Sequence, residues 1–156
     1  LQIANLGATI ANRGYFITPH VVKEVEDEAL DSLYTSKRYT KVREEHYETI
    51  VQGMRAAVTG GTCRAANLPG LDVCGKTGTA QNRGKDHSAF MGFAPMDNPK
   101  IAVSVYVENG GWGATYGVPI GALIIEKYLN GKLSPQSEVK ANDIQMRRID
   151  YGIHER

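Results

Sequence analysis

Three apolar segments joined by short turns constrain the fold of this chain more strongly than any other feature. They span residues 71–80, 87–94 and 101–107, and the third places Ile or Val at every second position, as a half-buried strand does. The turn-rich residues between them leave no room for the long crossover that parallel strands require. We therefore expect three consecutive antiparallel strands.

Two helices are predicted before this sheet. The first should run over residues 1–12 and end at Gly14, in the left-handed conformation that favours glycine. The second should run over residues 45–59 and end at Gly60 and Gly61, and its predicted apolar face consists of Tyr47, Ile50, Val51, Met54 and Val58.

A third helix is expected after the sheet, with Pro119 in its first turn and Gly131 just beyond its end. Its predicted apolar residues are Ile120, Leu123 and Ile124. Helices before and after an antiparallel sheet define an α+β fold.

The 156 residues fit one domain, which we place at residues 1–131, followed by a charged tail at 132–156 with room for one short helix. Residues 15–25 read as an irregular strand, and residues 26–46 are polar and are expected to form a flexible excursion. The sequence is expected to be part of a longer protein, because helical spacing begins at its first residues, Leu1, Ile3, Leu6 and Ile10.

Composition excludes several classes of function. The net charge is +1, so electrostatics give no support for nucleic-acid or anionic-membrane binding. The longest apolar run, 118–125, is far shorter than the ~18–20 residues that span a bilayer. Cys63 and Cys74 cannot build a disulfide framework, and no metal-ligand spacing links the histidines, His20, His46, His87 and His154.

Two glycine patterns suggest nucleotide binding, and both lack the required context. Residues 70–77 match the phosphate-loop pattern GxxxxGK[ST], but no apolar strand precedes them and no helix is predicted to follow. Gly111, Gly113 and Gly117 resemble a dinucleotide-binding turn, but no second parallel strand is predicted after them. A P-loop nucleotide-binding domain remains an alternative, and the second pattern favours a close-packed turn.

The motif Lys76-Thr77-Gly78-Thr79, on the first predicted strand, favours different chemistry. K-T-G is one of three signatures of penicillin-interacting serine acyl-transferases. With the blocks at 75–82, 87–95, 98–103 and 107–111 in this order, the chain resembles the C-terminal part of the transpeptidase domain of class B penicillin-binding proteins, most closely the elongation-type (penicillin-binding protein 2) group. The resemblance covers residues 1–25 and 45–130.

The resemblance implies a peptidoglycan D,D-transpeptidase that cross-links stem peptides ending in D-Ala-D-Ala through a serine acyl-enzyme, and that binds β-lactams. It assigns Lys76, Thr77, Gly78 and Thr79 to substrate binding, and the backbone N–H of Thr79 to the oxyanion hole. Trp112 is a further candidate at the border of the site. The resemblance implies no cofactor, and it places the protein on the periplasmic side of the inner membrane.

The family's other two signatures are missing. The one S-x-x-K match, residues 137–140, lies in the tail, no S-x-N occurs, and the Y-x-N at 128–130 lies on the wrong side of K-T-G. We expect the nucleophile and a membrane anchor upstream of Leu1, and no activity from these residues alone.

A non-catalytic structural module is the remaining alternative. The family's sheet has five strands, so we also expect the strand at 101–107 to expose an apolar edge through which the chain dimerises.

Overall fold

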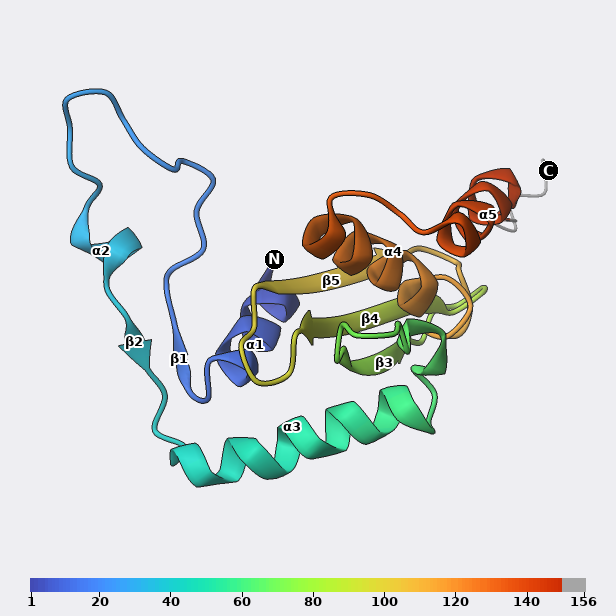
Figure 1. Cartoon of the computed structure of the whole chain (residues 1–156), viewed down its shortest axis with the longest axis horizontal. Coiled ribbons are helices and arrows are strands. Elements are labelled where there is room, and N and C mark those ends of the chain that lie inside the picture. Colours follow the sequence, from blue (N-terminus) through green and yellow to red (C-terminus); the bar gives the residue numbers. More distant parts are fainter. Residues whose placement is uncertain (150–156) are drawn as a thin grey trace.

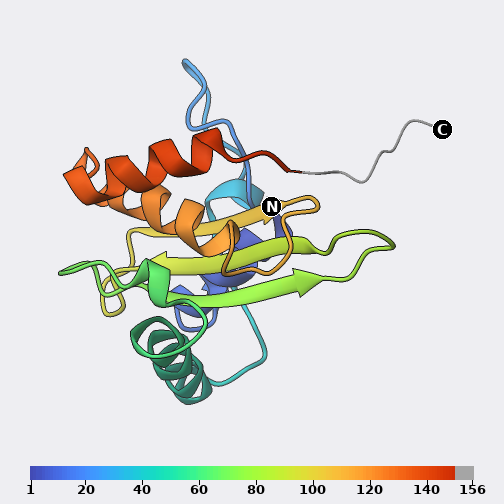
Figure 2. The same ribbon diagram turned by 90° about the vertical axis from the view of Figure 1, so that its right-hand side faces the viewer.

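The computed structural model describes residues 1–149 and shows a three-stranded sheet between two layers of helices (Figures 1 and 2). The α+β prediction is therefore confirmed. No helix within residues 1–149 is long and apolar enough to cross a membrane. In chain order the elements are α1 (Gln2–Ala11), β1 (Tyr15–Phe16), α2 (Ser32–Thr35), β2 (Arg38–Tyr39), α3 (Glu44–Thr59), the 3₁₀ helix η1 (Arg64–Ala66), β3 (Cys74–Ala80), β4 (His87–Ala94), β5 (Ile101–Val107), α4 (Gly117–Asn130) and α5 (Pro135–Met146).

The main sheet has the order β3-β4-β5, and both pairs are antiparallel, with Lys76 opposite Met91 and Met91 opposite Ser104. The bounds of β4 and β5 match the prediction. The first strand begins later than predicted, because Asp72 adopts a positive φ of 40° and turns the chain before Cys74.

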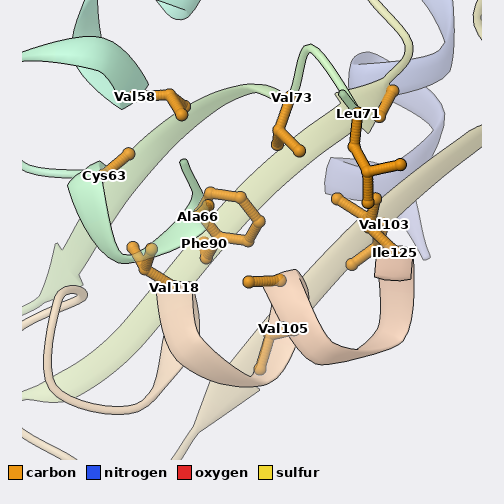
Figure 3. Close-up of a cluster of buried hydrophobic side chains, with 12 residues drawn as sticks. Val58, Cys63, Ala66, Leu71, Val73, Phe90, Val103, Val105, Val118 and Ile125 are labelled. Atoms are coloured by element: carbon orange, nitrogen blue, oxygen red, sulfur yellow. The ribbon is translucent and has the colours of Figure 1, made fainter. Parts of the chain in front are cut away.

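Each face of the sheet is covered by its own hydrophobic cluster. On one face α4 packs over Phe90, Val103 and Val105, in a cluster that also includes η1 (Figure 3). On the other face α1 and α3 pack over Cys74 and Phe93. Alternation along the strands sends neighbouring side chains to opposite clusters.

The end of α1 differs from the prediction. Arg13, and not Gly14, is the residue after the helix cap, with φ 55°, and its N–H donates to the Ile10 carbonyl at 3.0 Å. The Gly14 N–H donates to the Thr9 carbonyl at 2.9 Å, which completes the two bonds of a Schellman motif. In this conformation the Arg13 guanidinium donates to the carbonyls of Ala11 and Met96.

The buried face of α4 also differs from the prediction. Ile124 is exposed, and Val118, Ala122 and Ile125 are buried instead. The helix lies so close to β4 that a Cβ at Gly121 would come within 2.3 Å of the Phe90 ring. Gly121 therefore lies on the packed face of α4, and an apolar pattern does not reveal a face that is defined by glycine. On α3, Ile50 is likewise a predicted core residue that is exposed.

Residues 17–37 extend away from the sheet as an arm (Figure 1). At its base β1 pairs with β2 in an antiparallel ladder, so the region predicted as an excursion at 26–46 contains α2, β2 and the start of α3. The tail contains α5, which packs against α4.

Candidate functional site

The K-T-G motif lies on β3, which is an outer strand of the main sheet within residues 1–149. Thr77 and Thr79 project from the face that carries Phe90 and α4, whereas Lys76 and Gly78 project from the opposite face. The two threonines therefore share a face, and Lys76 does not share it.

Lys76 nevertheless brings its charge to the strand's edge. Its exposed side chain turns back so that Nζ donates to the Thr77 carbonyl at 2.8 Å. The Thr77 backbone faces the open side of β3, because its partners, the Lys76 ammonium and the Cys63 thiol, lie outside β4, and both backbone groups of a residue in an antiparallel strand face the same side. Thr79, two residues further, has the same orientation, so its backbone N–H also points out of the open edge.

Thr62 joins the site from the segment after α3, and the site prediction did not include it. Its hydroxyl lies 2.9 Å from that of Thr77. The tight turn at the end of α3 places Thr62 there. Gly61 packs so closely against this helix that a Cβ at Gly61 would lie 2.9 Å from the backbone of Ala57. The sequence signal was the Gly60-Gly61-Thr62 run.

Cys63 lies behind this contact and is fully buried. Burial raises the pKa of its thiol, outweighing the hydrogen bonds of Thr62 and the Thr77 backbone and the charge of Lys76, which lower it. Burial likewise raises the pKa of Cys74 to about 11. Both cysteines are therefore neutral thiols at pH 7 and poor nucleophiles.

The loop between β5 and α4 packs over β4 and reaches β3 beside the motif. A Cβ at Gly113 would lie 2.6 Å from the Gly78 carbonyl and 3.0 Å from the Thr77 Cβ, so glycine allows this approach. The buried Ser88 hydroxyl donates to the Trp112 carbonyl at 2.8 Å and accepts from the Gly117 N–H at 3.0 Å. The Trp112 side chain is 76% exposed, so the structure brings its backbone, rather than its ring, to the site.

The phosphate-loop alternative is wrong. Lys76 and Thr77 lie inside β3, and no helix begins between β3 and β4 to face a phosphate. Gly113 and Gly117 are the close-packed turn that the sequence favoured, since a Cβ at Gly117 would lie 2.8 Å from the backbone of Ala89.

The described histidines lie in structural contacts. His87 accepts from the Asn109 N–H at 2.9 Å at the end of β4, His20 contacts the Thr18 carbonyl, and His46 lies beside Arg43 on the surface. His154 is outside the described residues. Within residues 1–149 no three His, Cys, Asp or Glu side chains are grouped to hold a metal ion.

The serine of the tail match is buried in the first turn of α5, where the Ser137 N–H donates to the N-cap hydroxyl of Ser134 at 3.4 Å. The Y-x-N residues, 128–130, end α4. Within residues 1–149 the hydrogen bonds of the K-T-G side chains involve Thr62 and the strand itself, and neither of these segments.

A polar strand edge carrying K-T-G, on a sheet enclosed by these helices, is typical of penicillin-interacting serine acyl-transferases. The chain belongs to the penicillin-binding protein transpeptidase family: the penicillin binding protein transpeptidase domain matches residues 1–129.

Several relatives support this assignment. The peptidoglycan D,D-transpeptidase MrdA of Haemophilus influenzae is 32% identical over 95% of this chain, and the match covers 26% of that protein. The crystal structure of Pseudomonas aeruginosa PBP2 in complex with WCK 5153 superposes with a TM-score of 0.70 at 34% identity, covering 86% of this chain and 31% of that one. The structure of the imipenem acyl-enzyme complex of Mycobacterium tuberculosis penicillin-binding protein A superposes with a TM-score of 0.66 at 31% identity. This match covers 81% of this chain and 29% of that chain.

The predicted family and fold are therefore confirmed. The chain spans less than a third of each of these relatives.

Proposed function

We propose that this chain supplies the substrate-binding edge of a peptidoglycan D,D-transpeptidase. The observation that carries the proposal is the open edge of β3, where the Lys76 ammonium, the Thr77 hydroxyl and outward-facing backbone groups lie together. A peptide added along such an edge gains main-chain hydrogen bonds, and the side chains select its end group.

Each residue has a role in this proposal. The substrate is a stem peptide ending in D-Ala-D-Ala, and β-lactams occupy the same edge. The Lys76 ammonium, with the Thr77 and Thr79 hydroxyls, binds the substrate carboxylate; an ammonium ~4 Å away contributes ~4 kcal/mol at an effective dielectric near 20. Gly78 keeps the strand free of a side chain, and the Thr79 N–H donates to the developing oxyanion. Trp112 borders the site through its loop.

The serine nucleophile and its lysine lie outside these 156 residues in this proposal, because the sequence offers no S-x-x-K before the K-T-G motif. The reaction then uses no cofactor: the serine oxygen attacks the penultimate D-Ala carbonyl, the terminal D-Ala leaves, and an amine of a second stem peptide takes the acyl group. Peptidoglycan as substrate places the site on the periplasmic side of the inner membrane.

Covalent labelling by penicillin tests the proposal. The natural chain that contains these residues should gain the mass of one penicillin, and Lys76→Met should slow this acylation about 100-fold, a loss typical for one preorganised donor. Lys85→Met, in the turn between β3 and β4, is the matched control and should acylate at the wild-type rate. A folded natural chain that gains no mass would overturn the proposal and favour a structural module.

We also propose that the 156-residue chain dimerises through β5. This strand has no second neighbour within residues 1–149, and an unpaired edge invites another chain. Light scattering at increasing concentration should show a dimer that Tyr106→Lys, on β5, weakens. Tyr128→Lys on α4 is the control at a similarly exposed tyrosine, and a strictly monomeric wild type would contradict the proposal.

A further inference from the structure

Arg147, just after α5, contacts the loop between β5 and α4, which packs against the K-T-G strand at Gly113. One guanidinium nitrogen donates to the Thr115 carbonyl at 3.1 Å, and the guanidinium carbon lies 5.5 Å from the centre of the Tyr116 ring. These contacts link the tail, which the family match does not include, to the loop at 110–116.

The guanidinium is itself held in place. Asp143, one helical turn earlier, accepts from Arg147 Nε at 3.0 Å and from a terminal nitrogen at 2.6 Å. Arginine is suited to this arrangement, because its planar fork can bind a carboxylate, a carbonyl and an aromatic face together.

The helix that carries Arg147 is anchored at its other end. The buried Glu126 of α4 accepts from the Ser134 N–H at 3.0 Å, at the residue that caps α5. Fixed at its start by Glu126, α5 presents Arg147 to the loop at a defined position.

The loop is thus held from two sides. Ser88 binds the Trp112 carbonyl from beneath, and Arg147 binds the Thr115 carbonyl from the surface. Between these two points lies Gly113, the residue that packs against Thr77 and Gly78.

We propose that Arg147 is a positioning residue that holds the loop at 110–116 against the K-T-G edge, so that the tail helix sets the shape of the substrate-binding strand. The functional part of this inference rests on the proposed transpeptidase function; the positional part does not.

Nuclear magnetic resonance on the 156-residue chain tests the positional part. Backbone order parameters at residues 112–115 should be ~0.85 in the wild type and fall below ~0.6 in Arg147→Ala. The control is Arg148→Ala, which makes the same change at the next, exposed residue and should leave the loop unchanged. The indole of Trp112, the single tryptophan, gives a second signal from the same loop.

A control measurement, a substitute variant and a defined negative outcome complete this test. Order parameters in α5 must stay at wild-type values, which separates loss of the loop contact from loss of the helix. If Arg147→Ala does not fold, Arg147→Lys replaces it, and a loop order below the wild type supports the proposal. Unchanged loop order in the folded variant, or an equal loss in Arg148→Ala, overturns it.

Penicillin acylation of the natural chain tests the functional part. Arg147→Ala should slow acylation about fivefold, within the usual range for indirect effects on a site, and Arg148→Ala should have no effect. Equal rates for both variants would overturn the functional part. If the wild type is not acylated, the proposed transpeptidase function is refuted, and so is the functional part of this inference. The order parameters then still show whether Arg147 holds the loop in position.

Discussion

The two outer strands of the sheet show how one backbone arrangement serves different purposes. On β3 the edge carries polar side chains, with Lys76 and Thr77 beside Thr62. On β5 the side chains that face α4, Val103 and Val105, are buried. The β3 edge is therefore polar and lies close to a loop, whereas the outer strand β5 is largely apolar.

Glycine accounts for much of the difference. Gly75 leaves space for the Phe90 ring, since a Cβ there would lie 2.5 Å from it, whereas β5 contains no glycine. The Phe90 side chain of the neighbouring strand β4 occupies the space beside Gly75, so β3 contributes little side-chain volume to the core there. The strand β5 contributes its own side chains, Val103 and Val105, to the core.

The largest effect is expected where the loop meets the β3 edge. Gly113→Ala places a methyl group 2.5 Å from the Ala89 carbonyl and should lower the free energy of unfolding by about 3 kcal/mol. Urea denaturation measures this loss. Gly84→Ala, in a turn where no atom lies within 4 Å of the new Cβ, is the control, and equal losses would contradict the close packing of the loop.

A smaller loss is expected from the core under β5. Val103→Ala removes two buried methyl groups and should cost about 2 kcal/mol of the free energy of unfolding. Val42→Ala, at a side chain that is 50% exposed, should cost far less. Thermal and urea denaturation would contradict the comparison if the two variants were equally stable.

Acid sensitivity should come from neither edge but from the α4–α5 junction. Burial raises the pKa of Glu126, but the hydrogen bonds of Ser137 and Ser134 and the charge of Lys140 outweigh it, so this pKa lies below the ordinary 4.5. The carboxylate therefore stabilises the fold above pH 4.5, and its contribution disappears as the pH falls through the lower, folded-state value.

Glu126→Gln should then cost about 1 kcal/mol of unfolding free energy at pH 7, and the cost should shrink below pH 4.5. Denaturation at a series of pH values measures it. The exposed Glu138→Gln is the control, and a cost that stays constant with pH would show that the charge of Glu126 is not responsible.

The smallest effect concerns the hydroxyl pair of the β3 edge. Thr62→Val and Thr77→Val should each be mild, and the double variant should reveal a coupling of about 0.5 kcal/mol. Urea denaturation of all four proteins completes the cycle. Additive losses would mean that the contact at 2.9 Å contributes nothing to stability.

Strands that follow a local alternation in the sequence were predicted, whereas features that depend on contacts between distant residues were missed. The bounds of β4 and β5 follow from alternation and turn residues. The strand β3 begins later than predicted because Asp72 adopts a positive φ, a conformation that the apolar pattern of the sequence does not indicate. The K-T-G residues were identifiable as a motif, but the Thr62 contact depends on how α3 ends against the sheet.

Arg147 was missed for the same reason. Its partner Thr115 lies 32 residues earlier, and nothing in either local sequence indicates the contact. The site's motif was thus predictable, whereas the support around it required the packed structure.

The arm at 17–37 has a consequence for how this fold tolerates change. Its two ends meet where the Thr40 N–H donates to the Gly14 carbonyl at 2.8 Å, and the Thr40 and Tyr47 hydroxyls lie 2.7 Å apart. A chain segment closed at its base costs only ~0.6 kcal/mol more for each doubling of its length. Insertions or a fused reporter domain within the arm should therefore leave the register of the main sheet intact, which makes the arm a place where length is nearly free to vary.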